Sequence, residues 1–222
     1  TDGDIKLYIN GDFVAQSYND GGASTANVLK DASTAIIGAW TDGSQAMDGL
    51  VSHLKILNVS VTQDQARELY TKPELTLPTG IASSALTLNM PFTEGSGTHV
   101  FDGSSNKITG TATGMTWATG QEYGFQHPLV RSNFQSTFRN SFSVSMWVKP
   151  DDGRPSAESS FFGTRNSGNE DWIHGNLQTD GDIAFYYKSN GTASEGRTSS
   201  AVFPNGSTSW THIVLIADNS AN

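Results

Sequence analysis

The side chains of this sequence that could do chemistry are few and far apart. Glu170 and Asp171 come nearest to an acid–base pair, but adjacent residues of a strand point to opposite faces, and neither has an acidic neighbour two positions away. The sequence contains no G-x-S-x-G motif and no cysteine, and its five histidines show neither H-x-x-x-H nor H-E-x-x-H spacing. We therefore expect no catalytic residues and no enzyme activity.

Two tryptophans lie where an aromatic ring can reach a ligand. Trp40 and Trp172 occur in the turn-forming sequences GAWTDG and NEDWIHG, where an aromatic side chain is more often exposed than inside a strand. Tyr186 and Tyr187 are neighbours in DIAFYYK, and strand alternation allows only one of them on a given face. These rings are the candidates for a recognition surface.

Composition narrows the class of protein. The chain has 222 residues, 22 acidic against 13 basic side chains and a formal net charge of −9. An anionic surface with so few cations is repelled by nucleic acid, so we expect no nucleic-acid partner. No stretch approaches the roughly 18–20 apolar residues of a membrane span, so we expect no membrane insertion. The first residues, TDGD, lack the basic and apolar regions of a signal peptide, so any export signal is expected outside this sequence.

Hydrophobic patterning predicts an all-β chain. Ile5, Leu7 and Ile9 share one face of a strand, and Asn10-Gly11 supplies the positive φ angles of a type I′ turn, so a β-hairpin is expected here. In residues 49–58, even-numbered positions are expected on one face and odd-numbered positions on the other. Further strands are expected at 35–39, 85–90, 100–101, 141–148, 160–163, 182–188 and 210–217, with Trp147 and Trp210 in the core.

A single helix is predicted between the strands. Thr62 can cap it, Gln65 occupies the capping-box position, and Lys72-Pro73 ends it. The following stretch, Pro73 to Ser84 (PELTLPTGIASS), is typical of a linker. Because helices do not alternate with the strands, the pattern favours an antiparallel β-sandwich over a parallel α/β sheet.

Several segments together point to one family. They are MPFTEGSGT (90–98) with DGSS (102–105), WATG (117–120), FSVSMWVKP (142–150), WTHIV (210–214), LYING (7–11), and GLVSHLKILN (49–58) with the helix that follows it. This set resembles the laminin G-like domains of the concanavalin A type. The resemblance implies an all-β fold: an antiparallel jelly-roll β-sandwich with one short helix.

The family's segments occur here in permuted order. Residues 1–72 resemble the second half of the domain, residues 73–84 form the linker, and residues 85–222 resemble the first half. Three origins fit this order: a circular permutant, one period cut from a tandem array, or halves exchanged between chains. Half a sandwich would expose sheet edges and core, so we expect the halves to close within one chain or with neighbouring copies.

The resemblance implies recognition of glycans by aromatic rings that stack on sugars beside polar groups. On this basis we assign Trp40, Asp42, Trp172 and Tyr187 as ligand-binding residues of a non-catalytic adhesion module. Its expected partners are glycans or surface polysaccharide and neighbouring copies of the domain, on an extracellular, cell-surface or virion protein. The alternative is a purely structural repeat, decoration or filament-forming unit. A polysaccharide hydrolase is disfavoured because the E-x-D-x-x-E strand of related glycosidases is missing.

The resemblance also implies a calcium ion, bound by carboxylates and carbonyls at the rim of the sandwich. Asp102 stands in the family's D-x-S turn and is the one metal ligand that we assign. The family's I-D-D-V segment is replaced here by Val51-Ser52-His53-Leu54, so a histidine stands where a carboxylate is usual.

Overall fold

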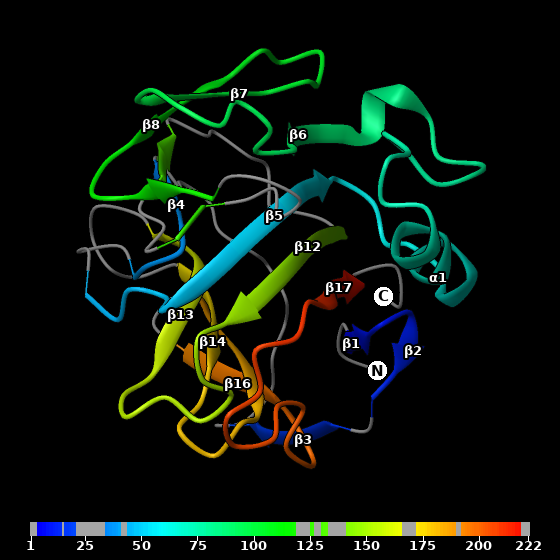
Figure 1. Ribbon diagram of the computed structural model, residues 1–222. Helices are drawn as coiled ribbons and strands as arrows, with labels where there is room; N and C mark the ends of the chain where they lie inside the picture. The colour runs from blue at the N-terminus through cyan, green and yellow to red at the C-terminus, as the bar shows by residue number, and fades with distance from the viewer. Residues whose placement is uncertain are drawn as a thin grey trace.

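A computed structural model describes residues 4–14, 16–20, 34–40, 44–118, 125–126, 130–132, 141–165, 172–189 and 192–218. They form two antiparallel sheets, one α-helix, α1 (Gln63–Thr71), and one 3₁₀ turn, η1 (Ser83–Ala85) (Figure 1).

Sheet A has the order β2 (Asp12–Phe13), β1 (Asp4–Ile9), β17 (Thr211–Asp218), β12 (Phe142–Pro150), β5 (Gly49–Leu57), β10 (Phe125–Gln126) and β9 (Thr116–Trp117), and β6 (Leu86–Met90) also pairs with β5. Sheet B has the order β3 (Gln16–Asp20), β16 (Thr192–Thr198), β15 (Ile183–Ser189), β14 (Trp172–Leu177), β13 (Ser159–Arg165), β4 (Thr34–Ile37), β11 (Val130–Ser132), β8 (Thr109–Ala112) and β7 (His99–Phe101). The predicted all-β fold class is confirmed.

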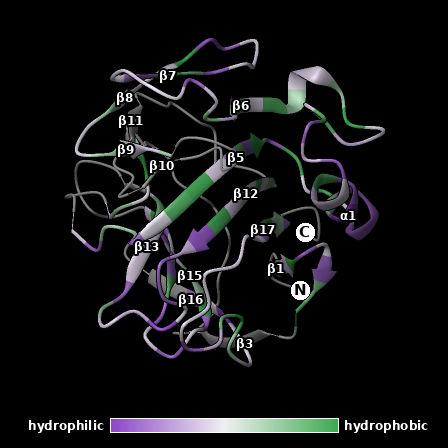
Figure 2. Ribbon diagram, viewed as in Figure 1, coloured by the Kyte–Doolittle hydropathy of each residue, from purple (hydrophilic) through white to green (hydrophobic). Residues whose placement is uncertain are grey.

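The hydrophobic core lies between the two sheets. In β12, every second residue from Phe142 to Val148 belongs to it, and in sheet B the ring of Phe161 meets that of Phe185 edge-on at 5.7 Å. Figure 2 shows hydrophobic residues along β5 and β12, whereas α1 carries mostly hydrophilic ones. Strand β12 therefore has one face toward the core and another toward solvent or a covering segment.

The N-terminal hairpin closes sheet A as predicted. Asn10 and Gly11 have φ angles of 51° and 81°, the positive values of a type I′ turn. β1 then pairs along its whole length with β17, from Asp4 opposite Asp218 to Ile9 opposite Ile213. Residues 1–72 and residues 85–222, which resemble the second and first halves of the family's domain, thus both contribute strands to sheet A and to sheet B within one chain. The three origins proposed for the permuted order remain predictions.

Strand β5 departs from strict alternation at His53. Both Val51 and Leu54 belong to the core, although one is odd-numbered and the other even-numbered. The pairing of β5 with β12 shifts register between Ser145 and Trp147, and His53 has a φ of 50°. The predicted split into even and odd faces is therefore wrong before His53, because a β-bulge inserts an extra residue there.

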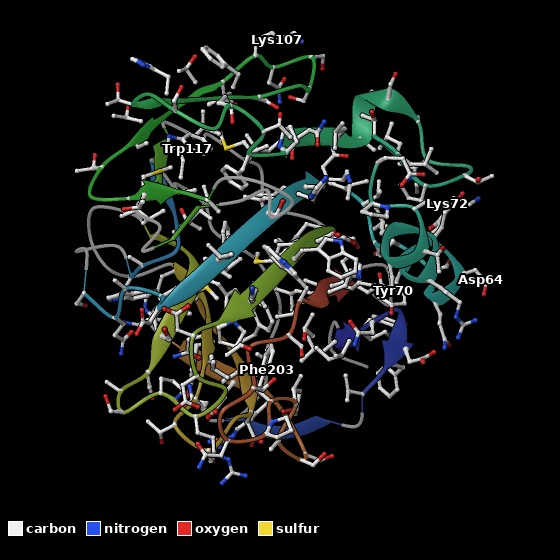
Figure 3. The ribbon with its side chains drawn as sticks, in the orientation of Figure 1. Asp64, Tyr70, Lys72, Lys107, Trp117 and Phe203 are labelled. Atoms are coloured by element: carbon white, nitrogen blue, oxygen red, sulfur yellow. The ribbon has the colours of Figure 1, made fainter. Side chains whose placement is uncertain are left out.

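An aromatic cluster lies on the outer side of sheet A. It includes Trp147, which was predicted from the sequence to lie in the core. Tyr70 points from α1 toward β12 (Figure 3), and its ring stacks on Trp147 at a centroid distance of 5.5 Å. Trp147 also lies 5.3 Å from the ring of His212. The expected core positions of Trp147 and Trp210 are wrong, since Trp147 faces the helix and neither ring belongs to the core between the sheets.

Helix α1 is capped as predicted and holds the segment that follows it. Thr62 Oγ1 accepts from the backbone N–H of Gln65 at 3.3 Å, and Gln65 Oε1 accepts from the backbone N–H of Thr62 at 2.9 Å. Glu68 accepts two hydrogen bonds from Thr79, and Leu77 packs on the apolar cluster beneath the helix. The segment 73–84 is thus packed on the sandwich. In the described part of the chain, no helix is both long and apolar enough to cross a membrane.

Candidate functional site

Trp40 and Trp172 meet on the face of sheet B that is turned away from the core. Their rings lie 5.6 Å apart between centroids and almost perpendicular, at 88°. Trp40 follows β4, and its backbone N–H donates to the carbonyl of Ser44 at 2.8 Å, whereas Trp172 opens β14. Both strands flank β13, so the two rings are brought together by sheet pairing between distant parts of the chain.

A glycine of β13 makes room for the first of these rings. Gly163 lies opposite Ile36 of β4 and His174 of β14. A Cβ atom at Gly163 would come within 3.2 Å of Cε3 of Trp40, closer than ordinary van der Waals contact. Because the position has no side chain, Trp40 can lie across β13 toward Trp172.

His174 supports Trp40 from below. Its ring lies 4.1 Å from that of Trp40, and its Nε2 shares a 2.5 Å hydrogen bond with Oγ of Ser160. Burial lowers the pKa of His174 to about 4, so the ring is neutral near pH 7. A neutral, hydrogen-bonded imidazole fixes the indole without placing a buried charge beneath it.

A network of side-chain hydrogen bonds extends along the same face from Ser160, the partner of His174, whose Oγ donates to Oε1 of Gln45 at 3.4 Å. Oε2 of Glu158 accepts from Nε2 of Gln45 at 3.1 Å and from Nδ2 of Asn176 at 3.0 Å. The amide oxygen of Asn176 in turn accepts from Nε2 of Gln178 at 2.8 Å. Glu158 is half-buried and Gln45 exposed, so the network reaches solvent while Asn176 beneath it is fully buried.

Tyr186 and Glu195 complete the candidate site. They face each other across β15 and β16, and Tyr186 also lies opposite His174, with 6.0 Å between the two rings. Burial, together with the negative charge of Glu195 and a hydrogen bond to it, raises the pKa of Tyr186. The phenol therefore stays protonated and can donate to a carboxylate or to a bound ligand.

The structure thus brings together some of the predicted ligand-binding residues. Trp40 and Trp172 meet, as a shared site requires. Asp42 lies outside the described residues, as does the side chain of Tyr187. Tyr186 is the tyrosine that the structure places beside His174.

Several members of the site were missed from sequence. They are Gln45, Glu158, Ser160, His174, Asn176 and Glu195. One usable signal was the alternation of Trp172, His174 and Asn176 in WIHGN, which puts three such side chains on one face of a strand. We expected a turn around Trp172, so this strand was not predicted. Glu158 carries no comparable signal, because its partners come from β14 and from the loop after β4.

Asp102, the predicted calcium ligand, is buried and organises a turn beside β6. Its Oδ1 accepts from the backbone N–H groups of Asn89 and Ser104, both at 2.8 Å. Its Oδ2 accepts from Oγ of Ser104 at 2.6 Å and from the N–H of Ile108 at 3.1 Å. Both oxygens are thus used by the protein. The part of the chain that is described holds no group of three or more His, Cys, Asp or Glu that could hold a metal, and the calcium ion stays a prediction.

Comparison with known proteins gives one result for this chain. Residues 123–222 match the laminin G-type family model described as the Concanavalin A-like lectin/glucanases superfamily. The matched range includes Trp172 and most of sheet B, and the resemblance stated from the sequence is confirmed for it. Trp40 lies outside it. No match to the chain was found among curated proteins or among solved structures.

Proposed function

We propose that this chain, whose residues 123–222 match a lectin-like superfamily, is a non-catalytic carbohydrate-recognition module. The observation that carries the proposal is the contact between Trp40 and Trp172 on the outer face of sheet B. Both rings are partly exposed, and the half-buried side chains of Glu158, Tyr186 and Glu195 come from the same face. Aromatic surface beside a few fixed polar groups is the combination that recognises small polar ligands.

The arrangement suits a sugar ring for two reasons. The C–H groups of a pyranose pack against an indole, while carboxylate oxygens accept hydrogen bonds from its hydroxyl groups. These groups are also fixed before a ligand arrives. The ring of Trp40 packs against His174 and over Gly163, and the amides of Gln45 and Asn176 donate hydrogen bonds to Glu158. Preorganisation of this kind reduces the entropy lost on binding.

In this proposal the module serves adhesion or recognition within a larger extracellular, cell-surface or virion protein. Its ligand is then a glycan or surface polysaccharide, and recognition needs no chemical step. The net charge of −9 suits a surface that must not adhere to nucleic acid or to anionic membranes.

The proposal is tested by binding to a glycan array with three single variants. Trp40→Ala and Trp172→Ala each remove one ring of the pair and are expected to abolish the binding seen with the unchanged chain. Phe101→Ala is the matched control, because Phe101 is an exposed aromatic residue on the edge strand β7 of the same sheet. Circular dichroism verifies that each variant is folded.

Two outcomes of the array would contradict the proposal. In one, Trp40→Ala and Trp172→Ala bind as tightly as the Phe101→Ala control. In the other, the unchanged chain binds no glycan and forms polymers as its concentration rises, which would favour a purely structural repeat or filament unit.

A further inference from the structure

We infer that Lys55, Trp147 and His212 form a buried binding site for a small anion, a halide, beneath helix α1. The site lies on the outer face of sheet A, whereas the Trp40–Trp172 pair lies on sheet B, so the inference does not depend on the proposed function. It follows from a buried lysine without a carboxylate partner and from two ring nitrogens without hydrogen-bond acceptors.

Strand pairing brings the three side chains to one small patch of sheet A. Lys55 of β5 lies opposite Ser145 of β12, and Trp147 of β12 lies opposite His212 of β17. Opposite side chains on one face have Cβ atoms about 5 Å apart, and diagonal ones are about 7–8 Å apart. His212 links the patch, because its Nε2 shares a 2.9 Å hydrogen bond with Oγ of Ser145 and its ring lies 5.3 Å from that of Trp147.

The ammonium group of Lys55 is a buried cation. Lys55 is only 4% exposed, and its Nζ donates to the carbonyl of Pro73 at 3.0 Å. No ion pair of Lys55 is found in the part of the chain that the structure describes. Burial lowers the pKa of Lys55 to about 8, although the charge of the exposed Glu74 opposes this shift. The group is still charged near pH 7, and a buried charge needs a counter-charge and further hydrogen bonds.

Trp147 and His212 each add a buried nitrogen that has no partner among the described residues, Nε1 of the indole and Nδ1 of the imidazole. Burial, and then the charge of Lys55, lower the pKa of His212 to about 3, so its ring is neutral and carries one hydrogen. In the described structure Nε2 of His212 is the acceptor for the hydroxyl hydrogen of Ser145, so the ring hydrogen lies on Nδ1. Both nitrogens are therefore donors, and leaving them unpaired in a buried place costs free energy.

A monatomic anion suits these groups. It accepts hydrogen bonds from several directions and also compensates the charge of Lys55, which a water molecule does not do. The ring of Tyr70 covers the patch, 5.5 Å from that of Trp147 and 6.0 Å from that of His212. An occupant beneath this cover has to be small, which favours chloride over sulfate or phosphate. A halide bound here stabilises the folded chain by mass action.

The indole N–H signal of Trp147 in a two-dimensional NMR spectrum tests the site. Trp147→Phe assigns the signal, and sodium chloride then replaces sodium gluconate near pH 7 at constant ionic strength. We expect the signal to shift saturably with chloride and the melting temperature to rise by about 2 °C or more. Trp117 is the control in the same spectrum, because its Nε1 already donates to the carbonyl of Gly97 at 2.9 Å and its signal should stay in place.

Lys55→Met removes the charge but keeps an apolar side chain, and it should abolish both responses to chloride. Lys72→Met is the matched control, since Lys72 is an exposed lysine at the end of α1 and should leave both responses unchanged. Circular dichroism verifies that both variants are folded. A Trp147 signal in the unchanged chain that ignores chloride would overturn the anion site and favour a bound water molecule. A response that persists in folded Lys55→Met would overturn it as well, because the effect would then come from the salt in solution.

Discussion

The indole rings of Trp40 and Trp172 lie edge to face, 5.6 Å apart, although one residue follows β4 and the other opens β14. The strand between them, β13, contributes Gly163 at the crossing point. The pair is therefore a product of tertiary pairing, and its geometry depends on a position that has no side chain. This dependence can be tested without any ligand.

Gly163→Val is expected to separate the two rings. Even a Cβ at this position would lie 3.2 Å from Trp40, and the two methyl groups of valine add further contacts. We expect the near-ultraviolet circular dichroism signal of the coupled indoles to decrease and glycan affinity to fall at least about tenfold. Gly175→Ala provides the contrast, because its Cβ would meet Phe185 and Phe161 on the core side. That change should lower the melting temperature; if it also abolishes the indole signal of the folded protein, the role given to Gly163 is wrong.

Acid should destabilise the fold through His174. Its pKa is about 4 in the folded protein because of burial, and about 6.5 in an unfolded chain. The unfolded state therefore takes up a proton first as the pH falls, and stability present above pH 6.5 is lost between pH 6.5 and 4. The loss from this residue is on the order of 3 kcal/mol.

Urea unfolding at several pH values measures this loss. In His174→Gln, the decrease in the free energy of unfolding between pH 6.5 and 4 should be clearly smaller than in the unchanged chain. Part of the decrease should remain, because burial also lowers the pKa of His212 to about 3. Identical pH profiles for the two proteins would rule out a buried neutral His174.

Removal of the Asp102 carboxylate should unfold its turn. Asp102→Ala leaves four protein donors without their acceptor in a buried place, at a cost of about 2–4 kcal/mol of unfolding free energy. Asp12→Ala is the control, since Asp12 forms an exposed ion pair with Arg67 and should cost less than about 1 kcal/mol. Thermal denaturation compares the two.

The same measurement with and without Ca²⁺ decides the calcium prediction. If Asp102 serves only its turn, calcium and its removal by a chelator leave the melting temperature of the unchanged chain as it is. A rise with calcium that disappears in Asp102→Asn would instead assign a calcium site to this carboxylate.

The two segments of permuted order should unfold together. Leu7 of β1 and Val144 of β12 belong to the same core, so Leu7→Ala should cost about 2–5 kcal/mol, Val144→Ala should cost less, and both should shift one shared transition. Tryptophan fluorescence and far-ultraviolet circular dichroism follow this transition during urea unfolding. Two separate transitions, of which each variant moves only one, would mean that residues 1–72 and 85–222 are independent units.

Local signals allowed much of the fold to be predicted from sequence. The turn at Asn10-Gly11 and the capping box of Thr62 and Gln65 are encoded by neighbouring residues, and the structure confirms both. The bulge at His53 was not predictable, because it depends on how β5 pairs with β12. Period-two patterning gives the strands but not the places where their register slips.

The candidate site was predicted less completely, for the same physical reason. Trp40 and Trp172 could be singled out because each lies among polar residues in the sequence. Their contact, and the support from His174, require β4, β13 and β14 to be neighbours. Glu195 reaches the site only through the pairing of β15 with β16. Such long-range juxtapositions leave no mark in a single sequence.

Binding at the tryptophan pair is the central claim, and the indole N–H signals in a two-dimensional NMR titration test it most directly. The chain has five tryptophans, so the spectrum has five such signals, and Trp40→Phe and Trp172→Phe assign two of them. On addition of a glycan found on the array, we expect the signals of Trp40 and Trp172 to shift while those of Trp117, Trp147 and Trp210 stay in place. Shifts confined to the other three tryptophans, with Trp40 and Trp172 unmoved at saturating glycan, would contradict the account.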